Sequence, residues 1–424
     1  MSYIGILSPT ASGHLNPMTT LGHELKQRGH QVTLFGSLDA QAHTLAADID
    51  FRPIAPVSMP LGSTQDALAR LGDLEGLSAL KYTIELFKQG TIVSLAEAPE
   101  ILKAENLDLL LIDQTLIAGG TIAEHLNIPF VTVCSALMLN RDPDIPPFNT
   151  GWAYNPTLPA RLRNRFAYTL LNNLTKPIHE VVASYRQKWG LPAYTHPNEA
   201  YSSLAQLCQQ PPGFEYPRTL LPKHFHFTGP YSRTTSRQPI PFPYEQLSDK
   251  PLIYASLGTV QNRLIEVFRQ IADACVDLDV QFVISLGGAL NKELLPTLSG
   301  SPLVVQYAPQ LEILKRATLC ITHAGMNTAL ECLAQGVPMV AIPIANDQPG
   351  VAARIRWSGT GEVIPLKTLT VDKLRQALTQ VLQDPSYRQQ ALTLQKDIDL
   401  AGGVSQAAKI VEQVIATKQP VQCR

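Results

Sequence analysis

The sequence has little of several features that would place it in other protein classes. Its 424 residues include only six cysteines, which are scattered and form no C-x-x-C pair, so neither a disulfide framework nor a zinc site is expected. Charged residues make up 16% of the chain and the formal net charge is −1, which argues against a general nucleic-acid surface. We therefore expect an ordinary globular protein of a reducing compartment, with a cytoplasmic location and no nucleic-acid partner.

Long hydrophobic segments are also missing. No stretch reaches the roughly 18 apolar residues that a membrane-spanning helix needs. The first residues show neither the basic region nor the apolar core of a signal peptide. We expect a soluble protein, and weak contact with a membrane surface stays open. The length exceeds what one hydrophobic core usually organises, so two domains are expected.

Short apolar runs alternate with helical patterns along the whole chain. This alternation is typical of βαβ units built around parallel sheets, and it predicts an α/β fold. Strands are expected at residues 3–7, 31–35, 107–112 and 128–133, and then at 252–257, 281–286, 303–307, 319–322 and 339–343. Residues 224–226 alternate as a further strand that leads into the linker.

A proline-rich segment at residues 236–243 separates the two series of strands and suits a semi-rigid linker. We predict an N-terminal Rossmann-like domain over residues 1–235, a linker over 236–248 and a C-terminal Rossmann-like domain over 249–405. Doubly wound sheets of this kind bind ligands outside the carboxyl ends of their strands. The expected site is therefore a cleft between the two domains.

A group of polar and small residues follows the strand expected at 319–322. His323, Gly325, Asn327 and Thr328 occupy the junction between this strand and the next helix. A helix N-terminus presents unpaired N–H groups and about half a positive charge, which suits a diphosphate. The glycine allows a close approach of the backbone, and the other three side chains can donate to phosphate oxygens. This junction predicts a site for a nucleotide diphosphate.

Neighbouring residues extend the predicted site toward a ribose and a base. Glu331, one helical turn further on, can accept hydrogen bonds from both ribose hydroxyls. Tyr307, Ala308 and Gln310 offer an aromatic face and an amide suited to a nucleobase. Thr259 lies in a second turn of small residues that can meet phosphates. Each feature is common by itself, and their order along the chain favours a nucleotide-sugar site.

A second candidate site lies near the start of the chain. His14 precedes a helix that we expect to begin at Pro17, with Asn16 as its N-cap. Attack by an alcohol on an anomeric carbon needs a base, and an imidazole suits this task. Asp113, after the strand expected at 107–112, would lie at the same sheet edge and fix the imidazole tautomer. We predict a catalytic His14–Asp113 dyad; the alternatives are a structural helix-start histidine and a turn-starting carboxylate.

The chain resembles the family 1 UDP-dependent glycosyltransferases, which have the GT-B fold of two facing Rossmann-like domains. The resemblance covers nearly the whole chain and suggests that residues 406–424 cross back to the N-terminal domain. The motifs that carry it are GHLNP at 13–17, HFTGP at 226–230, YAPQLEIL at 307–314 and THAGMNTALECLAQGVPMVAIPIANDQ at 322–348.

The resemblance implies a role for each matching residue. The uracil would be faced by Tyr307, Ala308 and Gln310, and the ribose by Glu331. The diphosphate would be bound by His323, Asn327 and Thr328, and the sugar hydroxyls would be held by Asp347 and Gln348. The nucleotide-sugar site would be completed by Gly13, Thr259 and Gly325. It assigns the same His14–Asp113 dyad as catalyst.

The predicted function is transfer of a hexose, with glucose expected, from a UDP-sugar to a hydroxyl of a hydrophobic small molecule. Residues 349–354 are similar to those of bacterial zeaxanthin glucosyltransferases, and the resemblance to macrolide glycosyltransferases is nearly as strong. The candidate acceptors are therefore carotenoids, polyketides, sterols and flavonoids. The two stretches 56–95 and 137–201 break the regular pattern with prolines and aromatics, and they are the expected walls of the acceptor pocket.

The reaction is expected to invert the anomeric carbon and to need no metal or other cofactor. Retaining enzymes of this fold often carry two glutamates eight positions apart, and the residue eight positions after Glu331 is Met339. The D-x-D motif at 142–144 lies in a proline-rich loop and is not expected to bind a metal.

Two alternatives stay open. Plant relatives usually have Trp where this chain has Tyr307 and Met326, so a TDP-deoxysugar donor is the first alternative. A catalytically silent GT-B partner protein is the second; such a protein could lose His14 without penalty, and this chain keeps it.

Overall fold

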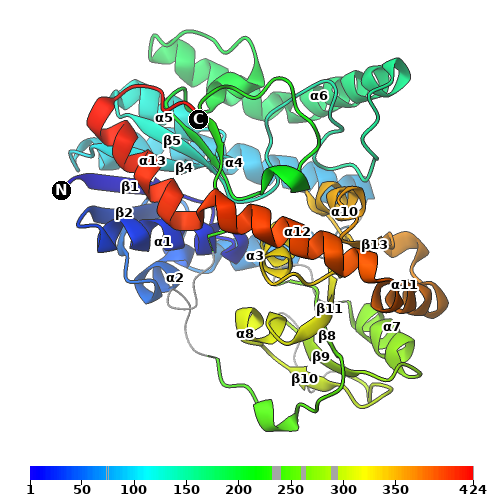
Figure 1. Cartoon of the computed structure of the whole chain (residues 1–424). Helices are drawn as coiled ribbons and strands as arrows, with labels where there is room; N and C mark the ends of the chain where they lie inside the picture. Colours follow the sequence, from blue (N-terminus) through cyan, green and yellow to red (C-terminus); the bar gives the residue numbers. More distant parts are fainter. Residues whose placement is uncertain (73, 75, 232–239, 259–263, 288–294, 424) are drawn as a thin grey trace.

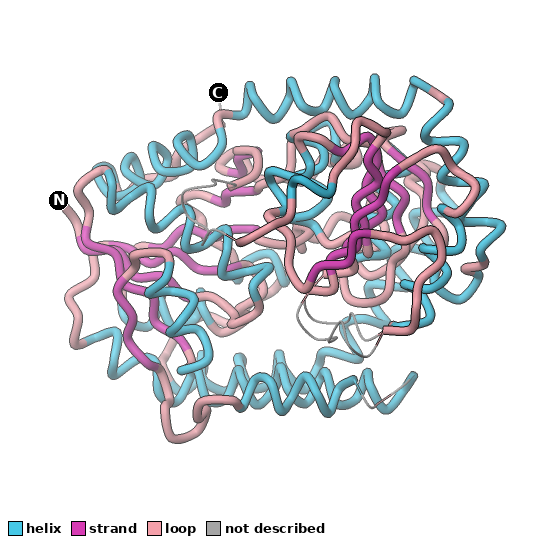
Figure 2. Tube along the Cα trace, turned by 90° about the horizontal axis from the view of Figure 1, so that it is seen from below, coloured by secondary structure: helices cyan, strands magenta, loops and turns pink. Residues whose placement is uncertain are grey.

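The computed structural model describes residues 1–72, 74, 76–231, 240–258, 264–287 and 295–423. Its architecture is two α/β halves, each built on one sheet that helices cover (Figure 1). In the described residues the N-terminal sheet has the strand order β3-β2-β1-β4-β5-β6-β7, and the C-terminal sheet has the order β10-β9-β8-β11-β12-β13. The strands in both sheets pair in parallel. Figure 2 shows the strands of the two halves with helices around them. The predicted fold of two doubly wound α/β domains is confirmed.

The N-terminal half contains the first seven strands and six of the described helices. The strands are β1 (Tyr3–Leu7), β2 (Gln31–Gly36), β3 (Asp50–Pro53), β4 (Leu109–Asp113), β5 (Phe130–Cys134), β6 (Gln206–Cys208) and β7 (Phe225–Phe227). The helices are α1 (Ser12–Gln27), α2 (Gln41–Ala46), α3 (Ser63–Gly72), α4 (Gly76–Lys103), α5 (Gly119–Leu126) and α6 (Leu158–Lys188).

The C-terminal half repeats the pattern and ends in a run of helices. Its strands are β8 (Leu252–Ser256), β9 (Gln281–Ser285), β10 (Leu303–Val305), β11 (Ala317–Thr322), β12 (Met339–Ala341) and β13 (Gly361–Val363). The helices are α7 (Ile265–Cys275), α8 (Gln310–Leu314), α9 (Met326–Ala334), α10 (Gln348–Trp357), α11 (Val371–Gln383), α12 (Pro385–Ala401) and α13 (Gly403–Thr417).

The central strands form where the sequence has its most continuous apolar runs. The residues of β4 and β8 are all buried, because helices cover both faces of each parallel sheet. Every strand expected from the sequence is present, with ends that differ by at most two residues. The strands β3, β6 and β13 were not predicted.

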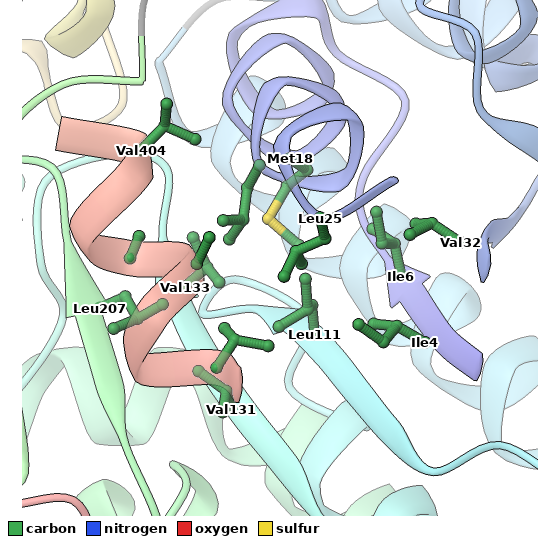
Figure 3. Packing of buried hydrophobic residues seen from close by; sticks show 14 of the residues in the cluster. Ile4, Ile6, Met18, Leu25, Val32, Leu111, Val131, Val133, Leu207 and Val404 are labelled. Atoms are coloured by element: carbon green, nitrogen blue, oxygen red, sulfur yellow. The ribbon is translucent and has the colours of Figure 1, made fainter. Parts of the chain in front are cut away.

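The final helix of the chain belongs to the core of the N-terminal half. Helix α13 lies beside α1, and Val404 packs in the same hydrophobic cluster as Val133 and Leu207 (Figure 3). Arg28 at the end of α1 donates to the hydroxyl of Ser405, at 2.7 Å. The chain therefore returns to its first domain after completing the second.

The helix expected to begin at Pro17 begins earlier. Helix α1 starts at Ser12, with Ala11 at the N-cap, so the prediction of Asn16 as the cap is wrong. Pro17 has no N–H for the carbonyl of Gly13, four residues before it. That carbonyl instead accepts a hydrogen bond from the Asn327 amide, at 2.6 Å, so the helix continues through the proline with its backbone satisfied.

Two further predictions concern the linker and membrane-spanning helices. Of the predicted linker, residues 236–239 lie outside the described residues, and 240–243 form neither helix nor strand. Among the residues that the structure describes, no helix combines the length and the apolar character needed to span a bilayer.

Candidate active site

The N-terminal sheet brings His14 and Asp113 together. Asp113 is the last residue of β4, and His14 lies in the first turn of α1, directly after the neighbouring strand β1. The His14 Nδ1 atom lies 2.9 Å from Asp113 Oδ2. The predicted proximity follows from the topology, because β1 and β4 are adjacent parallel strands whose carboxyl ends meet at one edge.

The surroundings of Asp113 keep its carboxylate charged. The side chain is 0% exposed, and its Oδ1 accepts hydrogen bonds from the Thr115 N–H at 2.9 Å and the Thr115 hydroxyl at 2.6 Å. Burial opposes the charge, but the attraction of His14 and these hydrogen bonds outweigh it and lower the pKa of Asp113. Because the carboxylate is ionised, Nδ1 of His14 carries the proton and Nε2 is left for another partner.

His14 is in turn held in a negative environment. Burial disfavours the imidazolium, but Asp113 and the more distant Asp347 outweigh burial and raise the pKa of His14 above its ordinary value. The side chain keeps 21% of its surface exposed. This histidine is suited to accept a proton from a molecule in the site.

Replacing Asp113 by asparagine should change the pH dependence of the reaction. A base must be unprotonated to act, so activity falls below the pKa of His14. Removing the negative charge lowers this pKa, and the acid limb of kcat/KM should move to lower pH while kcat falls. Asp108→Asn, which changes a carboxylate at the other end of β4 that accepts from the Tyr3 N–H, is the control. An acid limb that stays in place in Asp113→Asn would separate the two residues functionally.

The start of α10 brings Asp347 from the C-terminal half to the N-terminal half. Its Oδ2 accepts a hydrogen bond from the Leu137 N–H, at 3.0 Å, and burial raises its pKa despite this bond and the proximity of His14. Gln348 turns its amide oxygen back to the N–H groups of Ile344 and Ala345, at 2.8 and 2.9 Å. Of the two residues predicted to hold sugar hydroxyls, Asp347 and Gln348, it is therefore Asp347 that lies near His14.

The junction between β11 and α9 is built tightly around His323. A Cβ atom on Gly258 or Gly325 would lie 2.6 or 2.5 Å from His323 Nε2, so both positions need glycine. Ala324, between His323 and Gly325, has φ of +64°, a left-handed conformation that an alanine rarely adopts. Burial lowers the pKa of His323 to about 4, against a smaller opposite effect of the Ser256 carbonyl. The imidazole is therefore neutral at neutral pH and can donate one hydrogen bond.

Asn327 forms a hydrogen bond between the two halves of the chain. It lies in the first turn of α9, beside Thr328, and its amide donates to the Gly13 carbonyl that Pro17 leaves without a partner. The structure thus brings Gly13 and Asn327, both predicted for the nucleotide-sugar site, into direct contact.

The residues predicted for the nucleoside form a hydrogen-bonded group. The Gln310 amide donates to Glu331 Oε2 at 2.7 Å and to the Thr328 hydroxyl at 3.4 Å. Tyr254 donates its hydroxyl to the Gln310 oxygen at 3.2 Å. Tyr307 is half-exposed, as a base platform must be, and its neighbour Ala308 is buried. Thr259, predicted for the same site, lies outside the described residues.

A small cavity lies where the two halves meet. Its lining combines residues of α1 and α9 with residues that follow β6 and β7: Asn16, Pro17, Gln209, Pro230, Tyr231, Asn327, Leu330 and Glu331. The predicted donor residues of the C-terminal half therefore face the start of α1, which carries His14.

Sequence reasoning missed several contacts of the site. Thr115 holds Asp113, and the pattern of an aspartate followed two residues later by threonine is a recognisable turn signal. Tyr254 and Leu137 carried no such signal, because their contacts join distant parts of the chain. In the described part of the chain, no group of three His, Cys, Asp or Glu side chains could hold a metal ion.

The fold of this chain matches that of solved glycosyltransferase structures. The structure resembles that of CalG4, the calicheamicin glycosyltransferase, with a TM-score of 0.76 at 23% identity, over 99% of this chain and 100% of the other. This architecture of two facing Rossmann-like domains is the GT-B fold of glycosyltransferases.

The profile of the family described as "UDP-glucoronosyl and UDP-glucosyl transferase" matches residues 6–398, and the chain belongs to this family. Zeaxanthin glucosyltransferase of Pantoea ananas is 33% identical over 99% of this chain and 98% of its own length. The NDP-glycosyltransferase YjiC of Bacillus subtilis (strain 168) is 27% identical over 97% of this chain and 96% of its own. The predicted family is confirmed, and the protein is a glycosyltransferase acting on small-molecule acceptors.

Proposed function

We propose that this glycosyltransferase moves glucose from UDP-glucose to a hydroxyl of a hydrophobic small molecule, with inversion at the anomeric carbon. The observation that carries the proposal is the His14–Asp113 pair, 2.9 Å apart, beside an Asp347 supplied by the other half of the chain. A base on one domain and donor-site residues on the other match the needs of a direct transfer.

The mechanism is a single displacement. Nε2 of His14 takes the proton of the acceptor hydroxyl as its oxygen bonds to the anomeric carbon, and the bond from that carbon to the diphosphate oxygen breaks. Asp113 holds the tautomer and stabilises the imidazolium that forms. The N-terminus of α9, with the side chains of His323, Asn327 and Thr328, receives the charge of the departing diphosphate.

The donor side is proposed from the nucleoside group. Glu331 is positioned by Gln310 to accept ribose hydroxyls, which supports a ribonucleotide, and Tyr307 offers a face for uracil. Asp347 and Gln348 are proposed to hold sugar hydroxyls. A TDP-deoxysugar is the alternative donor, since the name of the Bacillus relative leaves the nucleotide open.

The acceptor side is proposed from similarity to a zeaxanthin glucosyltransferase over nearly the whole chain. A hydroxylated carotenoid is therefore the first acceptor to test, ahead of polyketides, sterols and flavonoids. The proposed reaction takes place in the cytoplasm and uses no metal, because the helix N-terminus and the polar side chains at the diphosphate already supply positive charge and donors.

Titration of the protein with UDP, TDP, UDP-glucose and NADH in excess EDTA should give micromolar binding of the uridine nucleotides and much weaker binding of NADH. Transfer to zeaxanthin, followed by mass spectrometry, should persist in the same buffer. Preference for TDP would move the proposal to deoxysugar transfer. Loss of transfer that Mg²⁺ or Mn²⁺ reverses would contradict the metal-free mechanism, and binding of no nucleotide would favour the silent partner.

A further inference from the structure

Helix α6 exposes an apolar stripe on the acceptor domain. Leu158, Leu162, Phe166 and Leu170 recur at every fourth residue, so they follow one side of the helix. All four are exposed, Leu162 at 55% and Phe166 at 74% of their surface. The buried residues of the same stretch, such as Ala160 and Asn164, lie on the other side. A row of large apolar side chains in water marks an interaction surface.

The charged side chains of α6 beside this stripe are all basic. Between Leu158 and His179 the helix carries Arg161, Arg163, Arg165 and Lys176 and no acidic residue. The formal net charge of the whole chain is −1, so this cluster is a local feature. Arg163 also lies over the ring of Trp152, 4.4 Å from its centre, at the edge of the same surface.

We propose that this basic amphipathic face, formed by the first half of α6, rests on the surface of an anionic lipid bilayer. Apolar side chains on one face and flanking arginines are the composition of helices that lie in the membrane interface. The exposed leucines and Phe166 enter the boundary of the acyl chains, and Arg161 and Arg165 meet lipid phosphates. Glu180 marks the end of the basic stretch, between the buried residues Ile178 and Val182.

Charge favours a bilayer over a second copy of the chain. Two copies joined through this face would place the arginines of one beside those of the other, whereas anionic headgroups neutralise them. Asp144, which pairs with Arg161, removes only part of the positive charge. The face therefore has the apolar centre and basic edge that an anionic surface recognises.

The position of the face relates it to the active site. Helix α6 lies on the outer side of the N-terminal half, away from the C-terminal sheet (Figure 1). The segment of residues 137–157 leads directly into α6, and its first residue, Leu137, donates to Asp347 in the site. A membrane under α6 would thus present dissolved apolar acceptors close to the domain proposed to bind them.

The test is flotation of the purified protein with vesicles of phosphatidylcholine, alone or mixed with phosphatidylglycerol, without donor or acceptor. The wild-type chain should float with the mixed vesicles, less in high salt and less with phosphatidylcholine alone. The double variant L162E/F166E should lose at least about tenfold in partition, since two inserted apolar side chains become charged. Arg165→Gln should lose about fivefold with the mixed vesicles only.

Leu400→Glu is the matched control. Leu400 is 85% exposed on α12, in the other half of the chain, and this variant should partition like the wild type. Thermal unfolding and the affinity for UDP, whose proposed contacts lie in the C-terminal half, should be unchanged in all variants, which keeps this test separate from the proposed reaction. Equal partition of L162E/F166E and wild type, or no binding of wild type to mixed vesicles, overturns the proposal. A wild-type dimer that L162E/F166E converts to a monomer assigns the face to a second copy instead.

Discussion

His14→Ala is expected to lower the turnover number by about 10²–10⁴ and to leave the affinity for UDP nearly unchanged. The histidine is the group placed to take the acceptor proton, because its Nδ1 is occupied by Asp113 and its pKa is raised by neighbouring carboxylates. The proposed nucleotide contacts come from the other half of the chain, around Glu331, so truncating His14 leaves them intact. Turnover measured by mass spectrometry and UDP affinity measured by calorimetry separate the two effects.

His23→Ala is the matched control for this experiment. It removes an imidazole from the same helix, α1, and should keep the turnover of the wild type. Wild-type turnover in His14→Ala would exclude His14 as the base. A loss of UDP binding equal to the loss of turnover would instead assign His14 to the architecture of the cleft.

The strands of the sheets were predictable from the sequence to different degrees. Buried strands such as β4 and β8 read as continuous apolar runs, since both faces of a parallel sheet are covered. The short strands β6 and β13 have three residues each, and the residues of β3 alternate between exposed and partly buried. None of these three strands therefore gives a long apolar run. Pairing with neighbours, and not local composition, makes these segments strands.

The features of the candidate site were also predictable from the sequence to different degrees. The motif from His323 to Gln348 is one continuous stretch, and the β11–α9 turn places its polar residues by local geometry. The bond from Asn327 to Gly13 joins residues 314 apart, and the bond from Leu137 to Asp347 joins residues 210 apart. Such contacts depend on how the two halves meet, and one of them gives a partner to the Gly13 carbonyl, for which Pro17 has no N–H. Sequence patterns indicate the residues of each half but not these bonds between halves.

A buried ion group holds the two halves together. Arg354 on α10 donates from Nε to Glu215 Oε2 at 2.8 Å and from Nη2 to Oε1 at 2.5 Å. Glu215, which follows Phe214 in the segment between β6 and β7, also faces Arg218 at 3.3 Å and accepts from Gln210 at 3.1 Å. Both arginines and the carboxylate are almost completely buried. One carboxylate therefore compensates two buried guanidinium groups.

Glu215→Gln is expected to cost about 3–5 kcal/mol of the free energy of unfolding, because it leaves buried charge without compensation. Arg354→Met should cost less, because Glu215 then still has Arg218 as its partner. Glu266→Gln, which breaks an exposed pair with Arg269, should leave stability unchanged and is the control. Chemical denaturation measures all three. A smaller loss in Glu215→Gln than in Arg354→Met would contradict the view that the carboxylate compensates both arginines.

The same group predicts how stability responds to acid. Burial opposes the charge of Glu215, but Arg354 and Arg218 outweigh burial and lower its pKa to about 2. In the unfolded chain this glutamate takes up its proton near its ordinary pKa of about 4.3. Between these two values the unfolded state binds more protons, so the contribution is present above the ordinary pKa and is lost as pH falls toward 2. Stability of the wild type should therefore fall more steeply through this window than that of Glu215→Gln, and parallel curves would show that the carboxylate is not held in its charged form.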